Sequence, residues 1–258
     1  MREALSKTLR RHAEKDGRGY PDWATRYLPI LRTLKGQALA EWRILEIGAN
    51  ANGFARFARA PVIAIDIERA QLDETRQNPH VRPVMADIAA LPVRDRQFDL
   101  IVCMDTFEHL PEAVRDRACA SIVRALRPGG RAVIGFPSGQ AAVEAEMRVR
   151  ARYRAYTGGT IRWLEEHDAL GLPDAAAIAD SFRRHAGTGF SVRLVGNTNV
   201  HVWEWMWHVL MCGWPGRGNA LFQVLLRWSV PVLSRLHGPP CYRMLIWLEA
   251  KPPAANGS

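Results

Sequence analysis

The chain has no uninterrupted run of about 18 uncharged apolar residues, so a helix that spans a membrane is not expected. The nearest approach, residues 200–236, is interrupted by Glu204, Arg217 and Arg227. The first residues, Met1 to Lys7, contain no apolar segment typical of a secretory signal. Cysteine is scarce and forms no CxxC pair. Reduced thiols in a cytoplasmic protein are therefore expected.

Lysine is also rare, and arginine supplies most of the basic residues behind the net charge of +9. This excess favours anionic partners such as phosphates, nucleic acid or an acidic membrane surface. An arginine-biased genome, indicated by the abundance of alanine, is the alternative explanation. No recognised RNA-binding module accompanies the charge, so nucleic acid is the least favoured partner.

What the sequence does contain is an alternation of strand-like and helix-like segments. The expected strands are residues 43–47, 62–66, 81–86, 98–104, 131–136, 190–194 and 241–250, with helices at 53–59, 67–76 and 112–126. Several of the strands are apolar without alternation, which indicates burial on both faces. This pattern predicts a parallel sheet covered by helices on both sides.

The remaining segments complete the predicted organisation. Residues 1–42 form an N-terminal helical segment, and 43–250 form the main domain. A helical insertion at 200–236 is followed, after the last strand, by a disordered tail at 251–258. The insertion is rich in tryptophan and arginine, a combination that suits the headgroup region of an anionic membrane. The favoured interpretation, however, is a helical pair that buries its tryptophans against the sheet.

The first strand runs into a turn of small residues, Gly48-Ala49-Asn50-Ala51-Asn52-Gly53, that opens a helix. Without bulky side chains, such a turn lets a nucleotide-like ligand approach the backbone. Glu46, Asp66 and Asp87 end the first three strands, and the ligand of an open parallel sheet lies across these ends. Asp66 follows Glu46 by about 20 residues. This is the spacing along the sequence at which an acidic side chain meets the ribose hydroxyls of a bound nucleotide. A solvated strand end is the alternative for any one acid, but three in phase favour a ligand.

Six motifs in order resemble the class I S-adenosylmethionine-dependent methyltransferases, of the broad group often called type 11. They are Leu45-Glu46-Ile47-Gly48, Ile65-Asp66, Ala86-Asp87-Ile88-Ala89-Ala90-Leu91-Pro92, Phe98-Asp99-Leu100-Ile101-Val102, Glu108-His109-Leu110 and Leu126-Arg127-Pro128-Gly129-Gly130. The resemblance implies an α/β, Rossmann-like sheet of seven mostly parallel strands, with helices on both faces and an antiparallel last strand.

The resemblance also implies S-adenosylmethionine as the cofactor. It assigns cofactor binding to Glu46, Gly48, Asn50, Asn52, Gly53, Asp66, Ile67, Asp87, Ile88, Met104 and Asp105. Glu46 and Gly48 would border the methionine part, and Asp66 would bind the ribose. Asp87 would face the adenine amino group while Ile88 packs on the ring, and Met104 and Asp105 would close the far side.

One departure from the family concerns the turn, which usually reads acid-x-Gly-x-Gly-x-Gly. Asn50 and Asn52 stand at the second and third glycines. Asparagine tolerates a left-handed backbone better than other non-glycine residues, so the turn is expected to survive. The two side chains either replace glycine in the turn or reach the cofactor, and Gly53 would become the residue of closest approach.

Asp105, Glu108 and His109 are spaced so that two carboxylates and an imidazole share one face of a helical turn. Some quinone-precursor and RNA-terminal methyltransferases bind a divalent metal through a similar Glu-x-x-Glu-His, and such ligands suit Mg²⁺ or Mn²⁺. We favour the other interpretation, in which Glu-His-Leu is a fold element and no metal binds. His109 is the candidate catalytic residue, as a general base, because a neutral imidazole is matched to neutral pH.

Two later motifs are candidates for the acceptor pocket. The segment Trp163-Leu164-Glu165-Glu166-His167 would form a wall of that pocket or serve packing alone. Asn197 and Asn199 follow the sixth expected strand at the ligand edge and are candidates to contact acceptor or cofactor.

The function expected from these features is methyl transfer to a small-molecule or lipid-linked acceptor, with O- or C-methylation favoured. No Asn/Asp-Pro-Pro-Tyr motif follows the fourth strand, which disfavours methylation of a base amine. One alternative is a non-catalytic methyltransferase-like binding module with a weakened cofactor site. Another is a nicotinamide oxidoreductase, against which stand Asp87, Glu108-His109-Leu110 and the late antiparallel strand. The expected location is the cytoplasm, and peripheral contact with an anionic membrane through 200–236 is the less favoured alternative.

Overall fold

The computed structural model describes residues 19–211 and 217–251. Its centre is a seven-stranded sheet in the order β3-β2-β1-β4-β5-β7-β6. The strands are β1 Ile44–Ile47, β2 Val62–Asp66, β3 Val81–Met85, β4 Phe98–Met104, β5 Leu126–Pro137, β6 Phe190–Asn199 and β7 Cys241–Ala250. The first five strands pair in parallel, and β7 runs antiparallel to both β5 and β6. The predicted sheet, with its antiparallel last strand, is confirmed.

Nine helices are described in these residues. They are α2 Tyr20–Thr33, α3 Phe54–Ala58, α4 Arg69–Thr75, α5 Glu112–Ala125, α6 Gln140–Thr157, α7 Arg162–Leu170, α8 Ala175–Ala186, α9 Val200–Met211 and α10 Arg217–Leu233. None of these helices is long and apolar enough to cross a bilayer.

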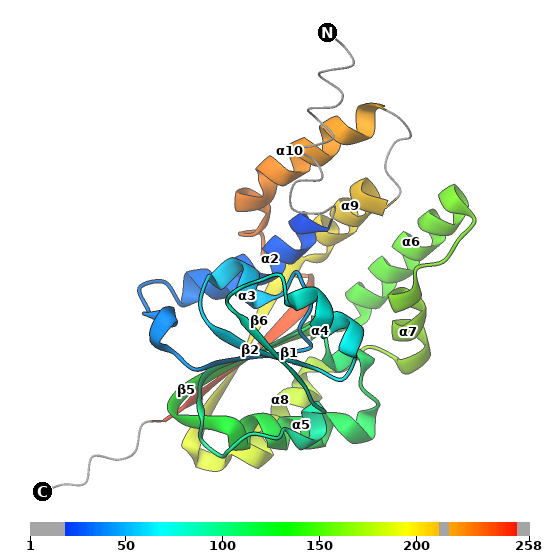
Figure 1. The fold of residues 1–258 in the computed structure, drawn as a ribbon. Helices are drawn as coiled ribbons and strands as arrows, with labels where there is room; N and C mark the ends of the chain where they lie inside the picture. The colour runs from blue at the N-terminus through cyan, green and yellow to red at the C-terminus, as the bar shows by residue number, and fades with distance from the viewer. Residues whose placement is uncertain (1–18, 212–216, 252–258) are drawn as a thin grey trace, which may run out of the picture.

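The sheet is buried on both faces because its strands are apolar at consecutive positions. In β4, Ile101 and Cys103 pack into the cluster beneath α5 and α8. The neighbouring residues Leu100 and Val102 face the cluster under α2 and α3. Figure 1 shows these helix pairs on opposite sides of the sheet. Consecutive apolar residues thus supply two separate cores, as the absence of alternation predicts.

A third apolar cluster joins α6, α7, α9 and α10 to the start of β7. At its centre Trp203 is fully buried and stacks on Tyr242 of β7, with ring centroids 3.7 Å apart. The proposal that this insertion buries its tryptophans is therefore right for Trp203, whereas Trp205 and Trp228 are exposed. Trp214 lies outside the described residues.

Arginines at alternate positions of α6 pair with residues of two other helices, α9 and α7, whose places in the fold are labelled in Figure 1. Residues two apart on a helix point to nearly opposite sides, because each residue turns the chain by about 100°. Arg148 and Arg152 accordingly reach Glu204 and His208 on α9. Arg150 reaches Asp168 on α7, at 2.8 Å.

Several expected boundaries were wrong. The fifth strand begins at Leu126 rather than at residue 131, and the sixth is longer because it pairs with a long neighbour. The sixth strand was expected to end at residue 194, but β6 continues to Asn199 because it pairs with β7 along its whole length. Asn197 and Asn199 therefore lie within the strand. Asn197 is fully buried and donates to the carbonyl of Arg26, and Asn199 donates to the carbonyl of Gly238.

Cys103, Cys119 and Cys241 are free thiols. Cys212 lies outside the described residues, as do residues 1–18 of the expected helical segment and 252–258 of the expected tail.

Candidate active site

Glu46, at the third position of β1, has its side chain buried beneath the turn that follows. One carboxylate oxygen accepts from the N–H of Phe54, and the other accepts from the N–H of Ala55 at 3.2 Å. These are the first N–H groups of α3, which no residue within that helix satisfies. A Cβ at Gly53 would lie 2.1 Å from a Glu46 oxygen. Glu46 therefore shapes the turn from below, and Gly53 provides the room it needs.

Burial raises the pKa of Glu46 to about 7, although hydrogen bonds from Phe54, Ala55 and Tyr27 oppose the shift. The desolvation of a carboxylate outweighs these donors because the side chain is almost completely removed from water.

Gly48 carries the left-handed backbone of the turn, with φ of +72°. A Cβ there would also lie 2.0 Å from the Thr106 hydroxyl, which follows β4. Asn50 and Asn52 have no positive φ, so the left-handed backbone expected for them is absent. Instead the Asn50 side chain accepts from the N–H of Asn52, at 2.9 Å, and the Asn52 side chain accepts from Arg56. Both side chains thus hydrogen-bond within the turn and its helix.

Asp66 and Asp87 lie at the carboxyl ends of neighbouring strands, as predicted. Asp66 accepts from the N–H of Glu68 at 2.7 Å, and Asp87 accepts from the N–H of Ala89 at 2.8 Å. Burial raises the pKa of Asp66 above its usual value. Next to it, Ile67 is 69% exposed, which leaves apolar surface beside two carboxylates. Ile88, by contrast, is buried.

Asp105 follows β4 with a left-handed backbone, φ 50°. Arg243 of β7 donates to both of its oxygens at 2.7–2.9 Å and also lies 3.2 Å from Asp22 of α2. Arg26 lies 2.6 Å from Asp22 and 3.0 Å from Asp105. Burial alone would raise the pKa of Asp105, but the two guanidinium groups hold it below its usual value. Two carboxylates and two arginines thus neutralise one another.

Asp105 was grouped with Glu108 and His109 in the weaker alternative, but its oxygens are engaged by Arg243 and Arg26. The residue that joins Glu108 and His109 is His167 of α7, whose ring centroid lies 4.9 Å from that of His109.

His109 and His167 each face a carboxylate. His109 Nδ1 lies 3.3 Å from Glu166, and His167 Nδ1 lies 2.9 Å from Glu146 of α6. The Tyr242 hydroxyl also donates to Glu146, at 2.6 Å. His109 is half-buried and His167 is buried, so the pair reaches from the protein interior to the surface.

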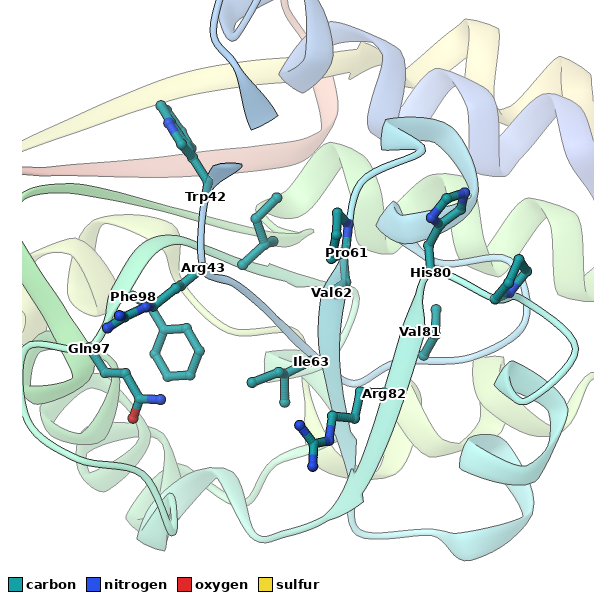
Figure 2. Close-up of a pocket in the computed structure, with 12 residues that line it drawn as sticks. Trp42, Arg43, Pro61, Val62, Ile63, His80, Val81, Arg82, Gln97 and Phe98 are labelled. Carbon is teal, nitrogen blue, oxygen red and sulfur yellow. The ribbon is translucent and has the colours of Figure 1, made fainter. Parts of the chain in front are cut away.

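A cavity of about 390 Å³ lies at the amino ends of the strands, on the side of the sheet opposite to their carboxyl ends. Figure 2 shows it lined by residues at the starts of the strands, among them Arg43, Val62, Val81 and Phe98. Asp66 and Asp105 lie at the carboxyl ends, so this cavity is not part of the candidate site.

Residues 45–134 match the family model described as "Methyltransferase domain". A malonyl-[acyl-carrier protein] O-methyltransferase of Enterobacter lignolyticus is 33% identical over 120 residues, which is 44% of this chain and 44% of that protein. The match thus spans less than half the length of that relative.

Solved structures share the fold at low identity. A possible histamine N-methyltransferase of Thermotoga maritima has a TM-score of 0.56 at 16% identity, over 94% of this chain and 98% of that chain. Phosphoethanolamine N-methyltransferase 2 of Haemonchus contortus, in complex with S-adenosyl-L-methionine, has a TM-score of 0.54 at 17% identity, over 87% and 52%. With the strand order, they show that the chain has the fold of these methyltransferases, and its residues 45–134 match a methyltransferase domain.

Proposed function

We propose that this protein transfers the methyl group of S-adenosylmethionine to an oxygen or carbon of a small-molecule or lipid-linked acceptor. The observation that carries the proposal is the Gly48–Gly53 turn, held in shape by Glu46, beside Asp66 at the end of the neighbouring strand. This is the arrangement that binds a nucleotide across the carboxyl ends of a parallel sheet.

The cofactor would lie across β1, β2 and β4. The Asp66 carboxylate, which has two acceptor oxygens, would bind the ribose hydroxyls. The exposed Ile67 and the residues Asp87 and Ile88 would border the adenine, and Gly48 would border the methionine part. Methyl transfer needs mainly the alignment of acceptor, methyl and sulfur. In the metal-free protein, His109, half-buried in the short turn Phe107–His109 after β4, is the candidate base for an acceptor proton.

Calorimetric titration with S-adenosylhomocysteine tests the cofactor site. We expect wild-type protein to bind and Asp66→Ala to weaken binding by about 10- to 100-fold, since hydrogen bonds to a charged group contribute about 1.5–3 kcal/mol. Asp73→Ala, on the exposed side of α4, is the matched control and should bind as wild type. Absence of binding at millimolar ligand would instead support a non-catalytic module.

The relative's name favours oxygen as the methylated atom, because that protein is a malonyl-[acyl-carrier protein] O-methyltransferase. A carboxyl or hydroxyl acceptor is accordingly the first class to assay with radiolabelled cofactor. A methyl ester would be hydrolysed by mild base. A labelled product that is stable in mild base would instead indicate a methyl ether or a methyl group on carbon.

We also propose that α10 contacts an anionic membrane. Its exposed apolar residues Leu221, Leu225, Trp228 and Val232 recur at helical spacing, and Trp228 is 71% exposed. Such a stripe on a basic chain suits the interface of a bilayer with negative headgroups. Co-sedimentation with vesicles of phosphatidylcholine and phosphatidylglycerol at low salt should deplete the protein from the supernatant. Protein that stays in the supernatant would contradict this part of the proposal.

A further inference from the structure

Glu108, His109 and His167 converge although they come from two separate elements. Glu108 and His109 belong to the turn Phe107–His109 after β4, and His167 lies near the end of α7. One potential ligand atom from each residue lies within 4.8 Å of the other two. No other group of three or more histidines, cysteines or acids in the described part of the chain meets this criterion.

Two of the three side chains present a buried polar atom without a partner among the described residues. Glu108 is 1% exposed and its Oε2 accepts no hydrogen bond, and His167 is 4% exposed and its Nε2 has no partner. A buried polar group left unpaired costs about 1–3 kcal/mol. A bound cation between these atoms would satisfy both at once.

The remaining ring nitrogens are already engaged in the way that metal-binding histidines require. His167 Nδ1 is 2.9 Å from Glu146, and His109 Nδ1 is 3.3 Å from Glu166. A carboxylate at Nδ1 holds the proton there and leaves Nε2 with a free lone pair. The Tyr242 hydroxyl fixes Glu146 in turn. The His167 imidazole is therefore oriented by a carboxylate before any ligand arrives, and the His109 imidazole lies beside another.

From this geometry we infer that Glu108, His109 and His167 bind a divalent transition-metal ion, with Zn²⁺ as the first candidate. Two imidazoles and one carboxylate are a ligand set that Zn²⁺ uses at sites with an open position. Ligand atoms about 2.0–2.2 Å from Zn²⁺ lie roughly 3.5 Å apart, so the side chains would close in by about 1 Å on binding. This ligand set differs from the one that the sequence suggested, because it contains His167 in place of Asp105.

His109 is half-buried, whereas Glu108 and His167 are buried, so His109 is the most exposed of the three ligands. Three protein ligands leave one position of a four-coordinate ion open. An oxygen of the acceptor is the ligand that this open position would take, a role that rests on the proposed methyl transfer and in which His109 is a ligand and not a base. The metal site itself does not depend on that role.

Titration of tag-free, chelator-treated protein with Co²⁺ tests the inference directly. We expect one ion per chain, visible absorption bands of a four- or five-coordinate site, and displacement by Zn²⁺. Glu108→Gln and His109→Ala should each weaken Co²⁺ binding by at least about 100-fold, because even loss of an outer carboxylate costs about 10- to 100-fold. His185→Ala, which removes another carboxylate-paired histidine, on α8, is the matched control and should bind Co²⁺ as wild type.

Circular dichroism and thermal unfolding establish that each variant is folded before titration. Glu108→Gln keeps the size of the side chain, so it should remain folded and bind S-adenosylhomocysteine as wild type. Failure of the metal site and failure of the cofactor site are thereby distinguished. The inference would be overturned by wild-type protein that shows no saturable Co²⁺ absorption, or by folded Glu108→Gln and His109→Ala proteins that bind Co²⁺ as tightly as wild type.

Discussion

Glu46 and Gly53 depend on each other. The carboxylate reaches the N–H groups of Phe54 and Ala55 only because residue 53 has no Cβ, which would lie 2.1 Å from the carboxylate. The family's acid-x-Gly-x-Gly-x-Gly pattern, counted from Glu46, ends at residue 52, so it does not indicate a role for Gly53. In this protein Gly53 leaves room for the Glu46 carboxylate.

Gly53→Ala should lower the free energy of unfolding by about 1–3 kcal/mol, the usual cost of forcing an extra methyl group into a packed site. Gly189→Ala is the control, because a Cβ there meets nothing within 4 Å and the backbone is not left-handed. It should leave stability unchanged or raise it by up to about 1 kcal/mol. Urea unfolding followed by tryptophan fluorescence measures both; equal stability of the two variants would contradict the proposed contact.

Glu46 also predicts a pH dependence. Its pKa is raised from 4.5 to about 7 in the folded protein. Between these values the unfolded chain has lost the proton and the folded protein keeps it, so stability falls as pH rises from about 4.5 to 7 and is flat above. Glu46→Gln should reduce this fall by about 1–3 kcal/mol.

The measurement compares urea unfolding of wild type and Glu46→Gln at pH 5 and pH 7.5. Glutamine presents an amide group to one of the two N–H donors, so the variant is expected to be less stable at both pH values. The difference between the two pH values is the informative quantity. An identical pH dependence in both proteins would show that Glu46 titrates as an ordinary carboxylate.

Helix α10 offers one face to the cluster around Leu226 and an opposite apolar stripe to solvent. Trp228→Asp should weaken vesicle binding by about tenfold or more, because burying a large apolar side chain contributes about 1.5–3 kcal/mol. Met147→Asp, which changes another exposed apolar residue, on α6, is the control. Equal loss of binding in both variants would indicate a general charge effect rather than docking by α10.

The strands and helices of the central sheet were predictable because their signals are local. Apolar runs such as Leu100–Met104 identify a strand buried on both faces, and Asp66 marks where its strand ends. The length of β6 was not predictable, since its last residues are strand only through pairing with β7, more than 40 positions later in the sequence. The same limit applies to His167, which reaches Glu108 through the packing of α7.

The largest feature that no sequence pattern indicated is the set of charges at Asp22, Arg26, Asp105 and Arg243. Asp22 and Arg243 are separated by 221 positions. Neither carries a local signal, because an acid in a first helical turn and an arginine in a strand are common on protein surfaces. Their burial becomes visible only when α2, the end of β4 and β7 are placed together.

Arg243→Met should lower the free energy of unfolding by about 3–5 kcal/mol, because it leaves two buried carboxylates with a single arginine. Adding Asp105→Asn should restore part of the loss, since the remaining Asp22 and Arg26 neutralise each other. Denaturant unfolding of the single and double variants gives the comparison. A single variant within about 1 kcal/mol of wild type would show that these charges are solvated and independent.

The position of β7 has a consequence for how the protein is made. In the described structure β6 pairs with no strand other than β7, and β7 lies between β5 and β6 although it comes last in the sequence. A nascent chain that has emerged only as far as α10 therefore holds β5 with a bare edge, β6 without a partner, and Asp105 without Arg243. Such a chain presents unpaired strand edges, which promote association with other chains. The ribosome must release nearly the whole domain before the sheet can close, so this protein is expected to need chaperone protection late in synthesis.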